Sequence, residues 1–229
     1  MTSMEKLIHI IPTPIGNLED ITFRSVRLLN EVDLILAEDT RVTKKLLNHY
    51  EIKTRMSSYH SFNEHKQLSN IITKINEGCQ VALVCDAGTP GISDPGFLLI
   101  RECIKHKIRV ICLPGATACI PAIIQSGIAC NNFTFEGFLP LKKGRKKKIN
   151  DILKSAQPTI IYESPHRILK TLKELYILSP ERKIVVLKEL SKLNETAYRG
   201  SLNIIINNIE QSTIKGEFVI ILDGAKKSK

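Results

Sequence analysis

Apolar and polar residues alternate along the first half of the chain in two different patterns. A mostly apolar run at Leu7–Ile11 and a continuous apolar run at Val81–Cys85 have the length of strands, and such runs are typical of strands buried on both faces of a parallel sheet. Between them, apolar residues recur at i, i+3, i+4 and i+7 from Leu68, which is the period of an amphipathic helix. Asn63 is the predicted N-cap of this helix, and Gly78 is its predicted end.

Further segments continue the alternation of strands and helices. Repeated β-α units predict an α/β fold in which a parallel sheet has helices on both faces. In the first half we also predict strands at Asp33–Ala37 and Arg109–Leu113 and helices at Thr22–Asn30, Thr40–His49 and Phe97–His106, with Asp20 or Thr22 as N-cap of the first and Thr40 as N-cap of the second.

The pattern breaks at Pro114-Gly115 and then begins again, which predicts a second α/β domain. We therefore expect an N-terminal domain at residues 1–116 and a C-terminal domain at residues 117–229. The second set comprises a helix at Thr117–Ser126, a segment at Phe133–Phe138, a strand at Thr159–Tyr162, a helix at His166–Leu178, a strand at Lys183–Leu190, a helix near Leu202–Glu210 and a strand at Glu217–Leu222.

Composition adds a charge to this picture. The 229 residues include 33 basic and 23 acidic side chains, a net charge of +10, which favours polyanionic partners and nucleic acid first. Part of the excess of basic over acidic residues could instead be surface lysines that only increase solvation. The six cysteines form no C-x-x-C pair and no zinc pattern, so we expect reduced thiols, no metal site and a cytoplasmic protein. No apolar run approaches the length of a membrane span.

A loop rich in glycine and proline follows the predicted strand Val81–Cys85. Ligands bind beyond the carboxyl ends of strands in open α/β sheets, and glycine lets the backbone approach a ligand closely. Residues 86–96 hold three glycines and two prolines, which predicts a site for a small polar cofactor. The loop after the first strand has one glycine where a G-x-G-x-x-G motif would stand, so a dinucleotide site is not expected. Polar residues also follow other strands, at residues 37–41, 114–118, 162–167 and 189–192, although each segment alone could be a cap or a turn.

A basic cluster at residues 142–148 has six positive side chains in seven positions. A solvated linker or the start of a helix would account for such a run. Like charges four residues apart on a helix repel each other, however, and a nearby phosphate backbone would offset that cost. We therefore favour nucleic-acid binding for Lys142, Lys143, Arg145, Lys146, Lys147 and Lys148, together with Arg167.

The ordered loop motifs resemble one known family. Residues 13–18, 37–41, 86–90, 93–96, 162–167 and 216–217 are similar to those of the ribosomal RNA small subunit methyltransferase I family, in the tetrapyrrole methylase (class III methyltransferase) superfamily. The resemblance covers residues 7–224. It implies two α/β domains, each with a mainly parallel or mixed sheet flanked by helices. It further implies S-adenosylmethionine in the cleft between the domains, and a homodimer. It also implies 2′-O-methylation of a cytidine of 16S rRNA at the decoding centre of the small ribosomal subunit.

The resemblance also implies which residues form the site. Those expected to contact the cofactor are Ile15, Asp86, Gly88, Thr89, Ile92, Ala116, Thr117, Tyr162, Glu163 and Leu190. Methyl transfer from sulfur to a ribose hydroxyl needs positioning and removal of a proton or stabilisation of the alkoxide. Among the titratable residues of the second-domain loops we favour Glu163 or Glu189 as the base and Lys192 as an electrostatic stabiliser.

The sequence departs from the family pattern in two places. The chain ends soon after Asp223, where family members often continue into a helical extension, so we expect part of the RNA-binding surface to be either missing or supplied by the Lys-rich segment. Ser61-Phe62 stands where the family often has acidic and His residues, which argues against a catalytic role for that segment.

Two alternative functions remain open. A precorrin or corrin methyltransferase would share the fold and the cofactor, and a non-enzymatic RNA-binding module would explain the charge but not the cofactor loops.

Overall fold

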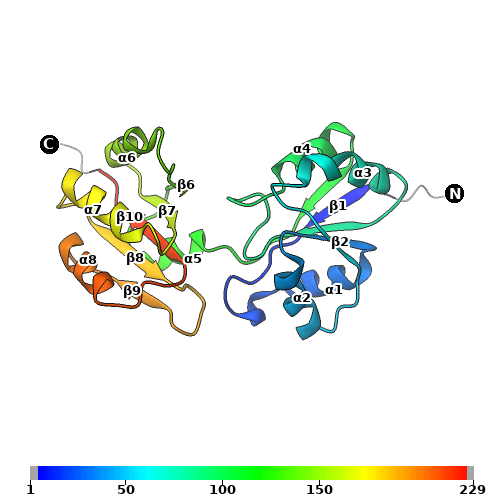
Figure 1. The fold of residues 1–229 in the computed structure, drawn as a ribbon, viewed down its shortest axis with the longest axis horizontal. Helices are drawn as coiled ribbons and strands as arrows, with labels where there is room; N and C mark the ends of the chain where they lie inside the picture. Colours follow the sequence, from blue (N-terminus) through cyan, green and yellow to red (C-terminus); the bar gives the residue numbers. More distant parts are fainter. Residues whose placement is uncertain (1–4, 226–229) are drawn as a thin grey trace. The chain divides into compact units, whose positions relative to one another are not determined.

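The computed structural model describes residues 5–225, and the chain divides between Thr117 and Ala118 into two compact units (Figure 1). We call them unit 1 and unit 2. Within the described residues each unit has a five-stranded sheet and its own apolar core. The predicted two-domain α/β class is confirmed, and of the two sheets one is parallel and the other is mixed. None of the helices in residues 5–225 is long and apolar enough to cross a membrane.

The sheet of unit 1 is parallel throughout, with strand order β3-β2-β4-β1-β5. Side chains of β1, β2 and β4 are buried on both faces, as expected from sequences that are apolar except for His9 of β1. The carboxyl ends of all five strands therefore lie at one edge of the sheet. The strands are β1 (Leu7–Ile10), β2 (Leu34–Ala37), β3 (Met56–Ser58), β4 (Val81–Val84) and β5 (Arg109–Cys112).

Helices cover both faces of this sheet (Figure 1). Leu29 of α1 and Leu47 of α2 share one core cluster with Ile35 of β2. Ile75 of α3 and Leu99 of α4 belong to the cluster on the other face. The elements are a short 3-10 helix η1 (Leu18–Asp20), α1 (Phe23–Glu31), α2 (Thr40–His49), α3 (Glu64–Asn76) and α4 (Phe97–Lys105).

The sheet of unit 2 is mixed, with strand order β6-β7-β10-β8-β9. β6 and β7 are parallel, whereas β10 runs antiparallel to both β7 and β8. Phe218 at the start of β10 is therefore paired with Glu163 at the end of β7 and with Lys188 at the end of β8. The strands are β6 (Thr134–Phe138), β7 (Thr159–Glu163), β8 (Ile184–Lys188), β9 (Thr196–Tyr198) and β10 (Phe218–Leu222).

Three helices of unit 2 share one apolar cluster with the sheet. Ile149 of α6, Leu172 of α7 and Ile205 of α8 are buried in it. The fourth helix, α5, packs against β8 and β10 without joining this cluster. The helices are α5 (Cys119–Ser126), α6 (Arg145–Lys154), α7 (Ile168–Leu178) and α8 (Leu202–Glu210).

The structure adds elements that the apolar pattern did not predict. β3 and β9 are three-residue strands without a full apolar repeat, and α6 is a complete helix where the basic run suggested at most a helix start. The predicted N-cap of α2 is wrong by one residue, because the side chain of Asp39, not Thr40, accepts the Arg41 N–H. Thr22 caps α1 as predicted, with its hydroxyl accepting the Ser25 N–H at 3.0 Å.

Candidate cofactor loops and catalytic cluster

Two loops of unit 1 are joined by a reciprocal pair of backbone hydrogen bonds. The Thr13 N–H donates to the Gly88 carbonyl at 2.8 Å, and the Gly88 N–H donates to the Thr13 carbonyl at 2.9 Å. The Thr13 hydroxyl also donates to the Cys85 carbonyl at 2.9 Å, and the hydroxyl is buried. These bonds fix the loop after β1 against the loop after β4, at the carboxyl edge of the parallel sheet.

The loop after β5 joins the same group. The Thr89 hydroxyl donates to the Ala116 carbonyl at 3.2 Å. Gly88 has φ of +86°, and a Cβ placed on it would lie 3.6 Å from the Ile15 side chain. Glycine is thus needed at position 88 for its backbone conformation and not for lack of space. Gly115 is needed for space, since its Cβ would lie 2.6 Å from Pro12 Cβ.

Four residues predicted to contact the cofactor, Ile15, Gly88, Thr89 and Ala116, therefore lie together at one edge of unit 1. Ile92 closes a turn of the same loop, with its N–H donating to the Thr89 carbonyl at 3.3 Å and its side chain exposed. Thr117 is the last residue of unit 1. Their roles in binding remain predictions.

Partly buried carboxylates stand beside these loops. The Asp39 N–H donates to Asp86 Oδ1 at 2.9 Å, and the Asp86 N–H donates to Glu38 Oε2 at 3.4 Å. Burial raises the pKa of both Asp86 and Glu38, with the neighbouring carboxylates adding to the shift. Asp39 differs, because its hydrogen bonds with Arg41 lower its pKa to about 2. Glu38 was missing from the predicted site residues, although its segment had been noted as a polar loop.

The corresponding edge of unit 2 holds a compact ion cluster. Lys192 Nζ lies 2.9 Å from Glu189 Oε1 and 2.9 Å from Glu217 Oε2. Glu189 Oε1 also accepts the Glu217 N–H at 2.9 Å. Because β8 ends beside the start of β10, these three residues meet although Glu189 and Glu217 are far apart in sequence. Glu217 is not among the predicted site residues, although the motif at residues 216–217 contains it.

The charges of this cluster are mutually stabilised. Burial alone raises the pKa of Glu189, but the hydrogen bonds and charge of Lys192 and the Glu217 N–H outweigh it and hold the pKa below its ordinary value. Burial alone lowers the pKa of Lys192, but its bonds to Glu189 and Glu217 raise the pKa above its ordinary value. Lys192 is therefore a fixed positive charge at neutral pH.

The turn that contains Glu189 and Lys192 has a strained backbone conformation. Glu189 and Ser191 both adopt positive φ, at 54° and 65°, which is uncommon for residues other than glycine. Gly216 faces the cluster, and a Cβ on it would lie 2.2 Å from Glu189 Oε1. Glycine at position 216 thus leaves the space that the Glu189 carboxylate occupies.

Glu163, the other predicted base, is enclosed. Its side chain is 0% exposed, and its carboxylate accepts the Ser164 N–H at 2.9 Å and the Thr171 hydroxyl at 2.7 Å. Arg167 Nε lies 3.2 Å from Glu163 Oε1. A carboxylate without solvent access and with its oxygens occupied is poorly placed to accept a proton from a substrate. This burial does not support a catalytic role for Glu163.

The buried network continues to Arg145. Arg145 Nη2 donates to the Thr171 hydroxyl at 2.7 Å and lies 2.8 Å from Glu174 Oε2. Arg145 Nη1 donates to the Pro140 carbonyl at 3.3 Å. The Thr171 hydroxyl therefore connects a buried guanidinium to the buried carboxylate of Glu163.

The basic cluster consequently divides into different environments. Arg145 is buried and bonded within the protein, so its position does not support the predicted RNA contact. Lys148 forms an ion pair with Glu136. The remaining members, Lys142, Lys143, Lys146 and Lys147, are exposed. Arg167, also predicted to contact RNA, is half-buried and donates to the Leu139 carbonyl at 2.6 Å.

Two predicted cofactor residues lie in unit 2. The ring of Tyr162 at the end of β7 packs edge-on against Phe135 and Phe138, with centroid distances of 4.9 and 5.9 Å. Leu190, directly after Glu189, is 7% exposed. Both lie at the edge that holds the ion cluster.

Comparison with known proteins places this arrangement in a class. The sequence matches the tetrapyrrole (corrin/porphyrin) methylases over residues 7–205. A cobalt-precorrin-4 methyltransferase has the same fold, with a TM-score of 0.70 and 16% identity over 95% of both chains. A diphthine synthase gives a TM-score of 0.75 and 11% identity over 95% of this chain and 90% of its own. The chain belongs to the tetrapyrrole methylase family.

Closer relatives define its group within that family. They are each named ribosomal RNA small subunit methyltransferase I. The Halalkalibacterium halodurans protein is 44% identical over 95% of this chain and 75% of its own length, and the Synechocystis sp. protein is 46% identical over 96% and 79%. The Thermotoga maritima protein is 42% identical over 96% of this chain and 99% of its own. The chain therefore belongs with the ribosomal RNA small subunit methyltransferases I.

Proposed function

We propose that this protein transfers a methyl group from S-adenosylmethionine to the 2′-hydroxyl of a cytidine in 16S rRNA of the small ribosomal subunit. The observation that carries this proposal is the 44–46% identity, over nearly the whole chain, to relatives named as small-subunit rRNA methyltransferases. The net charge of +10 and the exposed lysines near the start of α6 are consistent with a polyanionic substrate.

The loops of unit 1 fit the proposed cofactor chemically. Asp86 and Glu38 are partly buried carboxylates whose raised pKa reflects negative charge in an unfavourable environment. A cationic ligand would offset that cost. The fixed backbone at Thr13, Gly88 and Thr89 offers polar groups in defined positions. S-adenosylmethionine supplies an electrophilic methyl group on a cationic sulfur.

The ion cluster of unit 2 fits the other half of the reaction. A ribose hydroxyl becomes a useful nucleophile when its proton is accepted or its developing negative charge is stabilised. Lys192 is a protonated amine that two carboxylates hold in place, and its side chain is 29% exposed. We assign it to stabilise the developing alkoxide. Glu189 is the favoured proton acceptor because its side chain is 22% exposed, whereas the side chain of Glu163 is fully buried.

The proposed partners are 16S rRNA or the small ribosomal subunit and a second copy of the chain. Sedimentation equilibrium of the purified protein measures its oligomeric state directly. A mass of one chain at every concentration tested would contradict the homodimer and leave the methyltransferase proposal standing.

Methylation of small subunits that lack the modification tests the activity. The protein is incubated with radiolabelled S-adenosylmethionine and such subunits, and the labelled nucleotide is mapped after nuclease digestion. We expect label on the ribose of a single cytidine. A parallel reaction contains a tetrapyrrole and no RNA, and label there instead of on RNA would favour the corrin-type alternative. Binding of RNA without any methyl transfer would favour the non-enzymatic module.

A further inference from the structure

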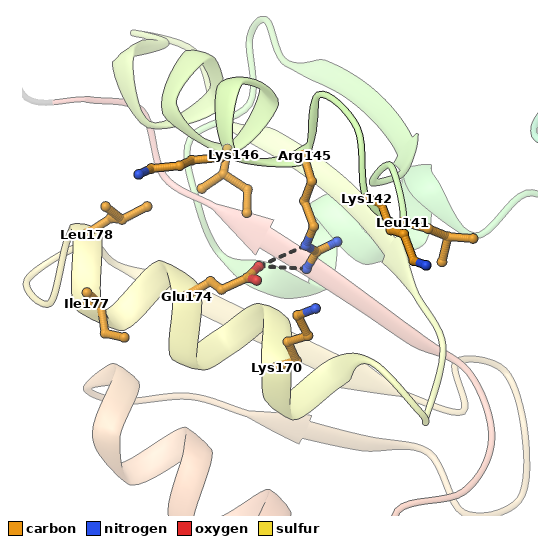
Figure 2. A pocket seen from close by; sticks show the side chains of 9 residues that line it. Leu141, Lys142, Arg145, Lys146, Lys170, Glu174, Ile177 and Leu178 are labelled. Carbon is orange, nitrogen blue, oxygen red and sulfur yellow. Dashed lines mark hydrogen bonds and ion pairs between the residues drawn. The ribbon is translucent and has the colours of Figure 1, made fainter.

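A groove in unit 2 lies apart from the ion cluster at the strand ends. It has a volume of about 500 Å³ and is formed by α6, α7 and the segment before α6 (Figure 2). This volume is in the range of sites for small organic molecules. Its lining residues are Leu141, Lys142, Arg145, Lys146, Ile149, Lys170, Glu174, Ile177 and Leu178.

The charges around the groove are unbalanced. Glu174 is the acidic residue of the lining, and its carboxylate is paired with Arg145 (Figure 2). Lys142, Lys146 and Lys170 are exposed, and among residues 5–225 no carboxylate forms an ion pair with any of them. The groove therefore carries three uncompensated positive charges, which favour an anionic ligand.

Apolar side chains provide the rest of the wall. Leu141 and Ile177 are 70% and 78% exposed, and Leu178 is 44% exposed. Exposed aliphatic side chains beside lysines suit a ligand with both an anionic part and an apolar face. A nucleotide has both, in its phosphate and the face of its base.

The floor of the groove is rigid. The Arg145 guanidinium is 7% exposed and is held by Glu174, Thr171 and the Pro140 carbonyl. These contacts fix α6 against α7, so the groove exists before a ligand arrives. A preformed site loses less conformational entropy on binding than a flexible one.

We propose that this groove binds a short unpaired segment of the RNA substrate, with its phosphates near Lys142, Lys146 and Lys170 and its bases against Leu141 at one end and Ile177 at the other (Figure 2). This inference rests on the proposed rRNA methyltransferase function and adds a second contact region for the same RNA. An acidic peptide is the main competing ligand. The RNA segment is favoured because the groove residues Lys142 and Lys146 are adjacent in sequence to the exposed Lys143 and Lys147, which extend the positive surface along a phosphate backbone.

Charge-neutral variants of the apolar wall give the sharpest test. Leu141→Ser and Ile177→Ser together should weaken binding of a single-stranded oligoribonucleotide of on the order of ten nucleotides by about tenfold, the scale of losing one base contact. The slope of log affinity against log salt should not change, because no charge is removed. Ile104→Ser with Ile204→Ser is the matched control, since both residues are exposed and lie outside the groove.

A second pair of variants separates the groove from general charge. Lys142→Ala with Lys146→Ala removes two groove lysines, and Lys143→Ala with Lys147→Ala removes two neighbours at the same spacing that do not line the groove. Each pair should reduce the salt slope by about 1.4, since each single-strand phosphate contact contributes roughly 0.7. The Lys142 and Lys146 variant should lose more affinity than the Lys143 and Lys147 variant, because it also removes lysines that contact the phosphates of RNA bound in the groove.

Photocrosslinking identifies the contact directly. Oligoribonucleotides that contain 4-thiouridine should crosslink to peptides covering residues 141–149 or 170–178. Equal effects of both lysine pairs, with no effect of the Leu141 and Ile177 variant, would overturn the proposal. So would weaker binding of the wall variant to whole subunits but not to naked RNA, which would indicate a ribosomal protein segment. If the wild-type protein methylates the RNA of small subunits, the proposed function stands even where one of these results overturns the groove proposal.

Discussion

The hydroxyl of Thr171 is the point at which a single-atom change tests the buried network of unit 2. It accepts a hydrogen bond from Arg145 Nη2 and donates one to Glu163 Oε2, both at 2.7 Å, and the residue is 0% exposed. Thr171→Val replaces this hydroxyl by a methyl group of similar size. The shape of the core is kept, while a buried guanidinium and a buried carboxylate each lose one partner.

The expected cost follows from the charges of the two partners. A hydrogen bond to a charged group contributes about 1.5–3 kcal/mol. Both ions keep other contacts, since Glu163 retains Ser164 and Arg167 while Arg145 retains Glu174. We therefore expect the free energy of unfolding of unit 2 to fall by about 2–4 kcal/mol. Thr171→Ser keeps the hydroxyl and loses one buried methyl group, which costs about 1 kcal/mol.

Hydrogen exchange measured by mass spectrometry suits a chain with two units, because it reports on each peptide separately. In Thr171→Val, peptides of α6, α7 and β7 should exchange faster in proportion to the lost stability, and peptides of unit 1 should not change. Thr171→Ser should lie close to wild type. A valine variant as protected as the serine variant would refute the reasoning, since it would mean that the two ions do not depend on this hydroxyl.

Four other variants test the site. Lys192→Ala should lower the single-turnover methylation rate by about 10²-fold or more, with RNA and cofactor affinities kept, and a near-wild-type rate would remove it from the mechanism. Gly216→Ala should slow the same reaction because its Cβ displaces the Glu189 carboxylate, and an unchanged rate would show that the carboxylate position does not matter. Asp86→Ala should abolish S-adenosylmethionine binding in calorimetry while the circular dichroism spectrum stays native. Burial raises the pKa of Glu38, so its cost to the stability of unit 1 grows as the pH rises from the ordinary pKa of glutamate to the raised pKa and is present in full above it. Glu38→Gln should therefore raise Tm at neutral pH and lose this advantage below the ordinary pKa of glutamate, and a pH-independent difference would contradict the assignment.

Much of the fold was predictable because several strands have sequences that indicate burial on both faces. The largely apolar sequence of β1 and the apolar sequence of β4 indicated a parallel sheet. β3 and β9 were not predicted because each has only three residues, some with hydroxyl side chains, and so shows no alternation of apolar and polar positions. α6 was missed because Ile149 and Ile152, its buried face, follow a run of lysines that conceals the helical period.

The site was predictable at the level of loops but not of individual side chains. Loops that follow parallel strands must share one edge, so the proximity of Ile15, Gly88 and Ala116 could be expected. Arg145 could not be distinguished from its basic neighbours, because its burial depends on Glu174, a residue on another helix. Likewise the choice between the two predicted bases depends on solvent access, which tertiary packing alone decides.

The reciprocal bonds between Thr13 and Gly88 have a consequence for how unit 1 folds. Thr13 and Cys85, which the same hydroxyl joins, are 72 residues apart in sequence. Closing so long a loop is entropically unfavourable until β1 pairs with β4, so these contacts form late in folding. No nascent chain that ends before the loop after β5 can hold the three loops together. Binding of a ligand at these loops would stabilise the sheet as a whole, and the melting temperature of unit 1 would then report ligand occupancy.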